Sequence, residues 1–426
     1  MPKCQSRSKI SIFRRRAVFN NGLPFYFWKL DFAGYQMTDT LMHNYAPFPV
    51  NFEKGEGALL WDTEGKTYLD ALAGIAVCSL GHAHPAVTKA ICDQAGKLVH
   101  TSNIYGISNQ QALADKLTQL SNMDNVFFSN SGAEANEAAI KLARLFGHSK
   151  NIDQPAIIVM EGSFHGRTMA TLTATGNRKI HAGFEPLVQG FVRAPYNDIE
   201  AIKNIAKNNH NVVAVLVEPI TGEGGINIPA DDYLNQIREI CDEQNWLMML
   251  DEIQTGICRT GRWFAHQHNG ITPDVMTLAK ALGNGVPIGA CLAKGEAAKL
   301  FQPGNHGSTY GGNPLVTAAA LAVIGTCEQN NLADRAANLS NKIISGFKDN
   351  LKDVDAVVDI RAKGLMIGIQ LDRPCAELVK AGLDAGILIN VTAGDVVRLL
   401  PPLIISDEQA DQIVTMVSDL IRSFVS

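Results

Sequence analysis

Residues 247–280 read LMMLDEIQTGICRTGRWFAHQHNGITPDVMTLAK. Two continuous apolar runs, 247–250 and 275–279, frame this stretch, and each is followed at once by a charged residue, Asp251 or Lys280. Similar runs lie on either side, at 126–128 (VFF), 156–160 (AIIVM), 212–217 (VVAVLV) and 288–293 (IGACLA). Short apolar runs separated by helical or loop stretches predict a buried, mostly parallel sheet with helices on both faces. The sequence therefore predicts an α/β fold.

The segments that flank this sheet show other patterns. Residues 50–80 contain short apolar runs broken by glycines, which predicts strands, and residues 84–120 carry apolar side chains at helical spacing. From residue 314 onward helical and strand patterns alternate, and the chain ends in an amphipathic helix that starts at Asp407. We therefore predict an N-terminal extension at 1–43, a large domain at 84–313, and a small α/β domain formed by 44–83 and 314–426.

Composition and charge exclude several classes of function. The net charge is −5 over 426 residues and no stretch is densely basic, which argues against binding to nucleic acid or to a membrane surface. No apolar run reaches the roughly 18 residues that a transmembrane helix needs. The eight cysteines are scattered without a C-x-x-C pair, which is typical of reduced thiols and not of a disulfide framework or a metal site. We predict a cytoplasmic protein that binds no metal.

The first 36 residues differ from the rest. Basic side chains cluster between residues 3 and 16, and no acid precedes Asp31. This composition is typical of an organelle transit segment, which would indicate a mitochondrial location. The aromatic run at 25–28 does not suit an amphipathic leader, so we interpret the segment as an extension that is disordered or that precedes the true start of the protein.

The chemistry of such a sheet is expected beyond the carboxyl ends of its strands. After the apolar run at 126–128, Ser131 is a good N-cap, and Gly132 lets a ligand approach the backbone. The small Ala133 leaves the first-turn N–H groups open. Unpaired N–H groups and the helix dipole favour an anion such as a phosphate. Ser-Gly before a helix is also ordinary capping, so this feature alone leaves both interpretations open.

Charged residues at the ends of two predicted strands provide further evidence for a ligand site. A carboxylate buried at Asp251 needs a cationic partner such as a protonated ring nitrogen, unless it only caps a turn. Lys280 precedes a glycine-rich segment without a nearby acid, so desolvation would free its amine as a nucleophile, unless it is solvated at a loop edge. Together with the anion seat, these are the groups that pyridoxal 5′-phosphate (PLP) requires: a phosphate anchor, a partner for its ring nitrogen and an amine.

From about residue 44 to its end, the chain resembles the class III (ω-) aminotransferases, which belong to the fold-type I PLP-dependent transferases. The resemblance implies a large domain with a mostly parallel sheet and a smaller α/β domain built from both ends of the chain. It also implies a homodimer with shared active sites. It is carried by NSGAEANEAAIKLAR, SFHGRT, EPITGEGG, DEIQTGICRTG, HGSTYGGNP and RLLPPL.

The resemblance also implies roles for individual residues. Lys280 would carry PLP as a Schiff base and act as catalytic base and acid, and Asp251 would pair with the ring nitrogen. The remaining cofactor contacts would come from Gly132, Ala133, Phe164, Gln254 and, from the neighbouring subunit, Thr309. The substrate contacts would come from Arg167, Glu223, Ser308 and Arg398, with Glu223 pairing with Arg398 when the reacting amine of the substrate has no adjacent carboxylate.

Two stretches, HTSNIY at 100–105 and AKALGNGVPIGA at 279–290, are most similar to the group that acts on N2-acetylornithine. That similarity implies transfer of the ω-amino group of N2-acetylornithine to 2-oxoglutarate, in arginine biosynthesis. The alternatives are aminotransfer from succinylornithine, succinyldiaminopimelate, ornithine or 4-aminobutyrate, a PLP aminomutase, or a non-catalytic PLP-binding protein. Two departures from the family pattern bear on substrate preference: Thr221 replaces a usual Gln, and Pro47 a common Arg.

Overall fold

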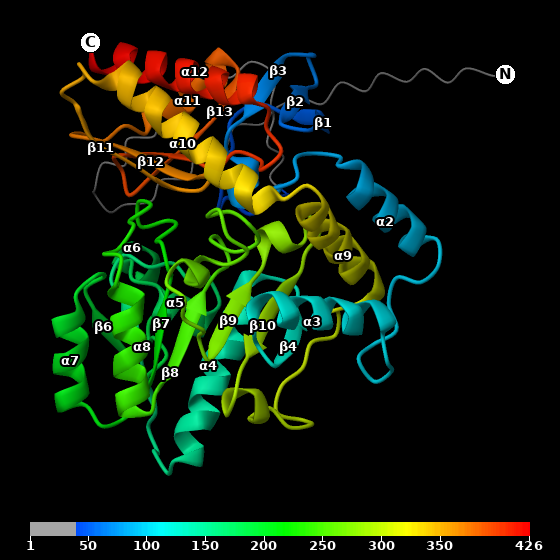
Figure 1. Ribbon diagram of the computed structural model, residues 1–426, viewed down its shortest axis with the longest axis vertical. Coiled ribbons are helices and arrows are strands. Elements are labelled where there is room, and N and C mark those ends of the chain that lie inside the picture. Colours follow the sequence, from blue (N-terminus) through cyan, green and yellow to red (C-terminus); the bar gives the residue numbers. More distant parts are fainter. Residues whose placement is uncertain (1–39) are drawn as a thin grey trace, which may run out of the picture. The chain divides into compact units, whose positions relative to one another are not determined.

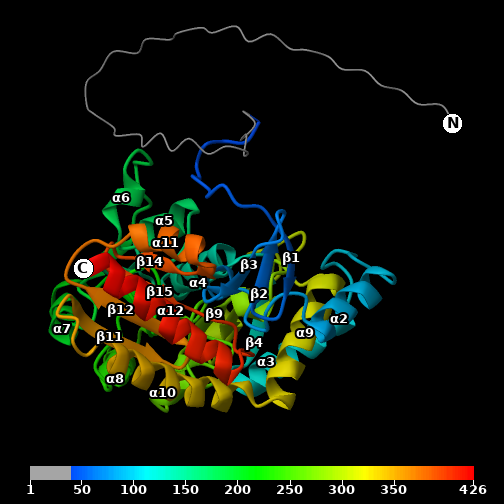
Figure 2. The ribbon, with the colours of Figure 1, turned by 90° about the horizontal axis from the view of Figure 1, so that it is seen from above.

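The computed structural model describes residues 40–426. The sequence-based prediction for the first 36 residues, and most of the predicted extension 1–43, lie outside the described residues. Residues 40–51 form a separate unit from residues 52–426, and Pro47 belongs to the first of these units. The second unit contains the helices and strands (Figures 1 and 2).

The seven-stranded central sheet confirms the α/β prediction. Only β10 runs antiparallel to both of its neighbours, and the other contacts between adjacent strands are parallel. In spatial order the strands are β4 (Asn125–Ser129), β10 (Gly289–Ala293), β9 (Val275–Leu278), β8 (Leu247–Asp251), β7 (Val212–Val217), β5 (Ala156–Met160) and β6 (Phe191–Ala194).

Both faces of this sheet are covered, which explains why its strands are apolar throughout. On β5, Ile157 and Val159 pack in the core that includes α4 (Gly132–Ser149), whereas Ile158 and Met160 pack in the core that includes α8 (Tyr233–Gln244). The short elements around the sheet are α5 (Met169–Ala174), α6 (Arg178–His181), α7 (Ile199–Asn208), η1 (Ala265–His268), η2 (Lys280–Leu282) and η3 (Ala297–Lys299).

This unit also contains two smaller four-stranded sheets, and the first of them pairs strands from both ends of the unit. The first contains β1 (Phe52–Glu56), β2 (Leu59–Asp62), β3 (Thr67–Asp70) and β13 (Ile387–Leu388), and β13 pairs with β3 in parallel. The second contains β11 (Val357–Lys363), β12 (Met366–Leu371), β15 (Val396–Leu399) and β14 (Asn390–Thr392). For the part of the proposed small domain that lies within residues 52–426, this pairing supports an origin from both ends of the chain.

The remaining helices flank these sheets. Contacts join α10 to α12 and α9 to α2, and Figure 1 shows both pairs lying side by side. Their bounds are α1 (Ala73–Ala76), α2 (Pro85–Ala95), α3 (Ser108–Ser121), α9 (Pro314–Gln329), α10 (Leu332–Leu351), α11 (Glu377–Ala385) and α12 (Asp407–Val425). None of the helices between residues 40 and 426 is both long and apolar enough to span a bilayer.

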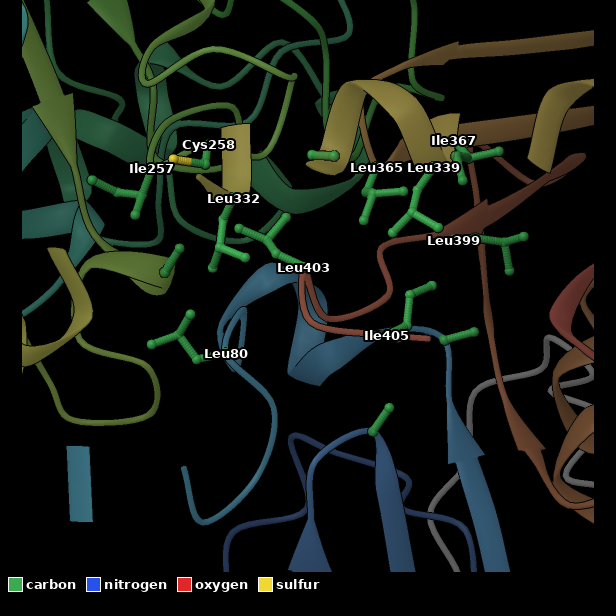
Figure 3. Close-up of a cluster of buried hydrophobic side chains, with 14 of the residues drawn as sticks. Leu80, Ile257, Cys258, Leu332, Leu339, Leu365, Ile367, Leu399, Leu403 and Ile405 are labelled. Carbon is green, nitrogen blue, oxygen red and sulfur yellow. The ribbon is translucent and has the colours of Figure 1, made fainter. Parts of the chain in front are cut away.

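One large apolar core joins the loop after β8 to the C-terminal segment. Figure 3 shows Leu80, Ile257, Leu365 and Leu403 converging in this core, and all four are at most 1% exposed. The core therefore fixes the loop that follows Asp251 against the terminal strands.

The helical prediction for 84–120 is confirmed at its two ends, as α2 and α3, but not in its middle. The helix α2 is capped by Gly96, and α3 begins only at Ser108. Between them Ser102 has a φ of +71°, a left-handed conformation that an α-helix cannot contain. The HTSNIY stretch is therefore a loop.

Candidate active site

A cavity of about 400 Å³ lies where the carboxyl ends of the central strands meet. Its lining comes from the segments directly after β4, β5, β7, β8 and β9, which is where ligands bind in open α/β sheets. The volume suits a small-molecule ligand. Of the residues predicted from the sequence, eight line it: Gly132, Ala133, Phe164, Arg167, Glu223, Asp251, Gln254 and Lys280.

The start of α4 provides an anion seat at this cavity. The Ser131 hydroxyl accepts a hydrogen bond from the Glu134 N–H at 3.2 Å, so it caps the helix as predicted. Within residues 40–426, the N–H groups of Gly132 and Ala133 have no acceptor. A Cβ at Gly132 would lie 2.7 Å from the Cδ1 atom of Ile253, so a larger residue would require the Ile253 side chain to move. Two free N–H groups at a helix start favour a bound phosphate.

Asp251, the last residue of β8, is 4% exposed and held by three donors. Its Oδ2 accepts hydrogen bonds from His165 Nδ1 and Asn136 Nδ2, both at 2.8 Å, and its Oδ1 accepts one from the Ile253 N–H at 3.1 Å. Asn136 is itself fixed, because its Oδ1 accepts a hydrogen bond from the Thr277 hydroxyl at 2.8 Å. These hydrogen bonds fix the orientation of the Asp251 carboxylate, which lies in the lining of the cavity.

Lys280 follows β9 and lines the same cavity as Asp251. Its φ of +45° is left-handed, which is uncommon for a residue with a side chain and often marks a functional position. Burial lowers the pKa of the Lys280 amine; Arg398 adds to this effect, and Glu223, Asp251 and Glu218 oppose it. Because the lowered pKa favours the neutral amine, Lys280 is suited to nucleophilic and proton-transfer chemistry.

The cavity also contains buried polar atoms that the described part of the chain leaves unsatisfied. Gln254 Oε1 and His165 Nε2 are buried and have no hydrogen-bond partner among residues 40–426. Such atoms are rare in folded proteins unless a ligand or an ordered water completes them. The aromatic ring of Phe164 lines the same space. Together with the free N–H pair, these features fit a flat, polar cofactor that carries a phosphate.

Arg398 on β15 is fully buried, and it contacts the cavity through Glu223. Its Nη1 donates a hydrogen bond to Glu223 Oε1 at 2.6 Å. Its Nε and Nη2 both donate to Asn390 Oδ1, at 3.1 and 2.7 Å. The side chain of Glu223 is 38% exposed, so it is the solvent-accessible partner of the pair.

The other predicted residues lie at the edge of the site. The guanidinium carbon of the exposed Arg167 is 5.7 Å from the centre of the Phe164 ring. Ser308 is not part of the cavity lining, but its hydroxyl accepts a hydrogen bond from Asn130 Nδ2, a lining residue, at 3.1 Å. Thr309 is exposed and does not line the cavity of its own chain.

Sequence reasoning assigned no role to several residues of this site. His165 and Asn136 hold Asp251 from distant parts of the chain, and no local pattern indicates these contacts. Asn390 holds Arg398 from the adjacent strand β14. Glu218 did carry a signal, because it directly follows the apolar run at 212–217. Its carboxylate is 6% exposed and accepts hydrogen bonds from the N–H groups of Phe164 and Gly222, both at 2.9 Å.

Burial raises the pKa of Glu218 from its usual 4.5 to about 7; Asp251 adds to the rise, and His165 and the two backbone donors oppose it. A raised folded-state pKa contributes stability that is complete below the unfolded value and is lost as the pH rises through about 7. We expect the free energy of unfolding to fall over this window, by on the order of 3 kcal/mol. The Glu218→Gln variant should lack this component.

Urea unfolding of the cofactor-free protein at about pH 5 and about pH 8 measures the effect. The wild type should lose more stability than Glu218→Gln between the two conditions. Parallel changes in both proteins would show that Glu218 titrates normally.

The fold and the cavity together define a fold-type I transaminase, a member of a PLP-dependent class of enzymes. The model of the class-III aminotransferase family matches residues 40–421, and the chain belongs to this family.

Relatives and solved structures agree with this membership. The chain is 57% identical over 385 residues to the acetylornithine aminotransferase of Nitrosomonas europaea. The aligned region covers 90% of this chain and 98% of that protein. The structure is similar to ornithine aminotransferase from Toxoplasma gondii, with a TM-score of 0.87, 36% identity and coverage of 90% and 93% of the two chains. Acetylornithine aminotransferase from Elizabethkingia anophelis gives a TM-score of 0.81, 36% identity and coverage of 90% and 96%.

Proposed function

We propose that this chain transfers the ω-amino group of N2-acetylornithine to 2-oxoglutarate, a step of arginine biosynthesis that yields N-acetylglutamate 5-semialdehyde and glutamate. The observation that carries the proposal is the ion pair between Glu223 and the buried Arg398 at the cavity that Lys280 lines. The names of the relatives support the choice of donor, because chains that are 43% to 57% identical are acetylornithine aminotransferases.

PLP is the cofactor that we assign to the cavity. When bound, it takes up the amino group and delocalises the negative charge that remains when the adjacent carbon loses a proton. We assign its phosphate to the N–H groups of Gly132 and Ala133, its ring to the face of Phe164 and its phenolic oxygen to Gln254. The free N–H pair supports the placement of the phosphate, and the amide N–H group of Gln254, a residue that lines the cavity, would donate to the phenolic oxygen.

Lys280 is the attachment point for the cofactor and the group that moves the substrate proton. Its lowered pKa keeps more of the released amine in the neutral form that accepts a proton. Asp251 stabilises a positive charge on the ring nitrogen, and His165 and Asn136 hold its carboxylate in place for this purpose.

The two substrates present different charges to one site. N2-acetylornithine offers a terminal amine, whereas glutamate carries an amine and a carboxylate on the same carbon. Because an unpaired guanidinium is costly when it is as buried as Arg398, Glu223 neutralises it while the acylated donor reacts. The Glu223 side chain turns away when the α-carboxylate of glutamate or 2-oxoglutarate binds Arg398. Arg167 binds another substrate carboxylate, and Ser308 lies near the substrate.

Replacing Glu223 by Ala should therefore change selectivity. Arg398 becomes available to glutamate at all times, but it is left uncompensated when the acylated donor binds. We expect the rate ratio of the glutamate half-reaction to the donor half-reaction to rise about tenfold. Stopped-flow measurement of both half-reactions tests this, with Glu200→Ala on α7 as a surface control. Equal changes in the two half-reactions would contradict the proposed gate.

The choice of amine donor is tested by a panel of half-reactions that are followed by the absorbance of the cofactor. N2-acetylornithine should give the highest specificity constant among N2-acetylornithine, succinylornithine, succinyldiaminopimelate, ornithine and 4-aminobutyrate. A higher value for any other donor would reassign the substrate. Formation of glutamate from 2-oxoglutarate distinguishes transamination from an aminomutase reaction, and no turnover with any donor would indicate a non-catalytic PLP-binding protein.

We also propose a homodimer with shared active sites. Large apolar side chains on the loops around the cavity are exposed: Leu98, Val99, Ile104, Tyr105 and Tyr310. Asn103 Nδ2 donates hydrogen bonds to the carbonyls of Ser308 and Gly311, so the two loops form one surface. If a second copy covers this surface, the exposed Thr309 of one subunit would contact the cofactor phosphate of the other subunit.

The Ile104→Asp variant should weaken this association, because a charge would then lie in a desolvated interface. Sedimentation velocity should show a wild-type dimer and a largely monomeric variant, with at least a roughly tenfold loss of turnover. Val358→Asp, which alters an exposed apolar residue on β11, is the matched control. A fully active wild-type monomer would contradict the proposal.

We also propose a cytoplasmic location. The cysteines of the described chain are all free, and five of them are buried, which suits a reducing compartment. Cell fractionation would test this location, and recovery in mitochondria would instead support the transit-segment interpretation of the first 36 residues.

A further inference from the structure

Side-chain hydrogen bonds between Thr221 and Asn227 hold together the two ends of the loop that carries Glu223. We call these hydrogen bonds the clasp. Thr221 is buried, with 1% of its surface exposed. Its hydroxyl accepts hydrogen bonds from the N–H of Asn227 at 2.9 Å and from Asn227 Nδ2 at 3.0 Å. Asn227 Nδ2 also donates to the Gly224 carbonyl at 2.8 Å. One threonine and one asparagine therefore fix the two ends of the segment 221–227.

The same segment is tied to the C-terminal strands through its backbone. Arg361 on β11 donates from Nε to the Ile226 carbonyl at 2.8 Å and from Nη2 to the Gly225 carbonyl at 2.6 Å. Thr392 on β14 donates to the carbonyl of Glu223 itself. Moving the backbone at residue 223 would break several of these hydrogen bonds at once.

The side chains of the ion pair have unequal freedom. Arg398 is fully buried and held by Asn390, whereas the side chain of Glu223 is 38% exposed. The Glu223 side chain can therefore exchange partners without breaking the clasp, whereas Arg398 would have to leave Asn390.

We propose that Thr221 is a positioning residue: its hydroxyl holds the loop 221–227 rigid, so that Glu223 leaves and rejoins Arg398 by side-chain rotation alone. The inference rests on the proposed function, in which Arg398 binds the α-carboxylate of one substrate and not of the other. It also gives a physical role to Thr221, where the family usually has Gln. A loose loop would spread Glu223 over many positions and weaken its return to Arg398.

The Thr221→Val variant removes the acceptor at nearly constant shape, and Thr221→Ser restores it. We expect Thr221→Val to accelerate amide hydrogen exchange across residues 222–227 and to raise the ratio of the glutamate to the donor half-reaction about five- to tenfold. The effect should appear mainly in the KM of the acylated donor, and Thr221→Ser should recover wild-type behaviour in both measurements. The Asn227→Ala variant changes an exposed residue and should reproduce the Thr221→Val effect more weakly, which keeps the test valid if the valine variant does not fold.

The controls separate this inference from the function on which it rests. If Thr221→Val and Asn227→Ala leave both exchange and selectivity unchanged while Glu223→Ala shifts selectivity, the gate stands and the rigid clasp is wrong. If Glu223→Ala also leaves selectivity unchanged, the proposed gate fails and the inference fails with it. Faster exchange without a change in selectivity would show that the clasp stabilises the loop only, and would overturn the role of Thr221 as a positioning residue.

Discussion

The Lys280→Ala variant should lose nearly all transaminase activity. Lys280 lines the same cavity as the other proposed cofactor contacts, and alanine provides neither the covalent attachment nor the base. Loss of general acid–base catalysis alone lowers turnover by about 100- to 10,000-fold. We expect a decrease of at least this size in kcat for both half-reactions.

A second measurement identifies the lysine without relying on activity. Borohydride reduction of the cofactor-loaded wild type, followed by peptide mass spectrometry, should place the reduced cofactor on the peptide that contains Lys280. Lys294, whose amine donates to the Asn122 carbonyl, provides the matched control variant Lys294→Ala, which should remain labelled and active. Full activity of Lys280→Ala, or a label on another lysine, would refute the assignment.

The Asp251→Asn variant should bind the cofactor but turn over at least about 100-fold more slowly. Asparagine keeps the size of the side chain but removes the negative charge that we expect to stabilise a protonated ring nitrogen. It also presents an amide to His165 and Asn136, whose nitrogen atoms are now 2.8 Å from Asp251 Oδ2. We therefore expect a large decrease in the steady-state kcat, but only a small change in the cofactor affinity that a binding titration measures.

Asp231→Asn, at an exposed position before α8, is the control for this experiment and should leave both quantities unchanged. A near-normal kcat in Asp251→Asn would exclude a role for its charge. A lost fold, detected by circular dichroism, would make Asp251→Glu the informative variant, because it keeps the charge and displaces it.

The central sheet and its two strand-end charges were predictable because continuous apolar runs and their boundaries are local properties of the sequence. Asp251 and Lys280 each follow such a run, so their convergence follows from the geometry of a parallel sheet. The start of α4 was predictable for the same reason, since Ser131 and Gly132 form a local cap.

The remaining features depend on contacts between distant segments. The pair of Glu223 with Arg398 spans 175 residues, and only the family resemblance indicated it. The support of Asp251 by His165 spans 86 residues. The loop between α2 and α3 was missed because apolar spacing continues across it, whereas the positive φ of Ser102 and the tie from Asn103 to Ser308 are tertiary features.

The central claim is that three groups far apart in the sequence surround one pyridine ring. A crystal structure of the protein grown with PLP tests it most directly. We predict electron density that joins the cofactor to the Lys280 amine, its ring nitrogen within hydrogen-bond distance of Asp251, and its phosphate at the N–H groups of Gly132 and Ala133. Cofactor bound outside this cavity, or bound inside it with the ring nitrogen away from Asp251, would contradict the account.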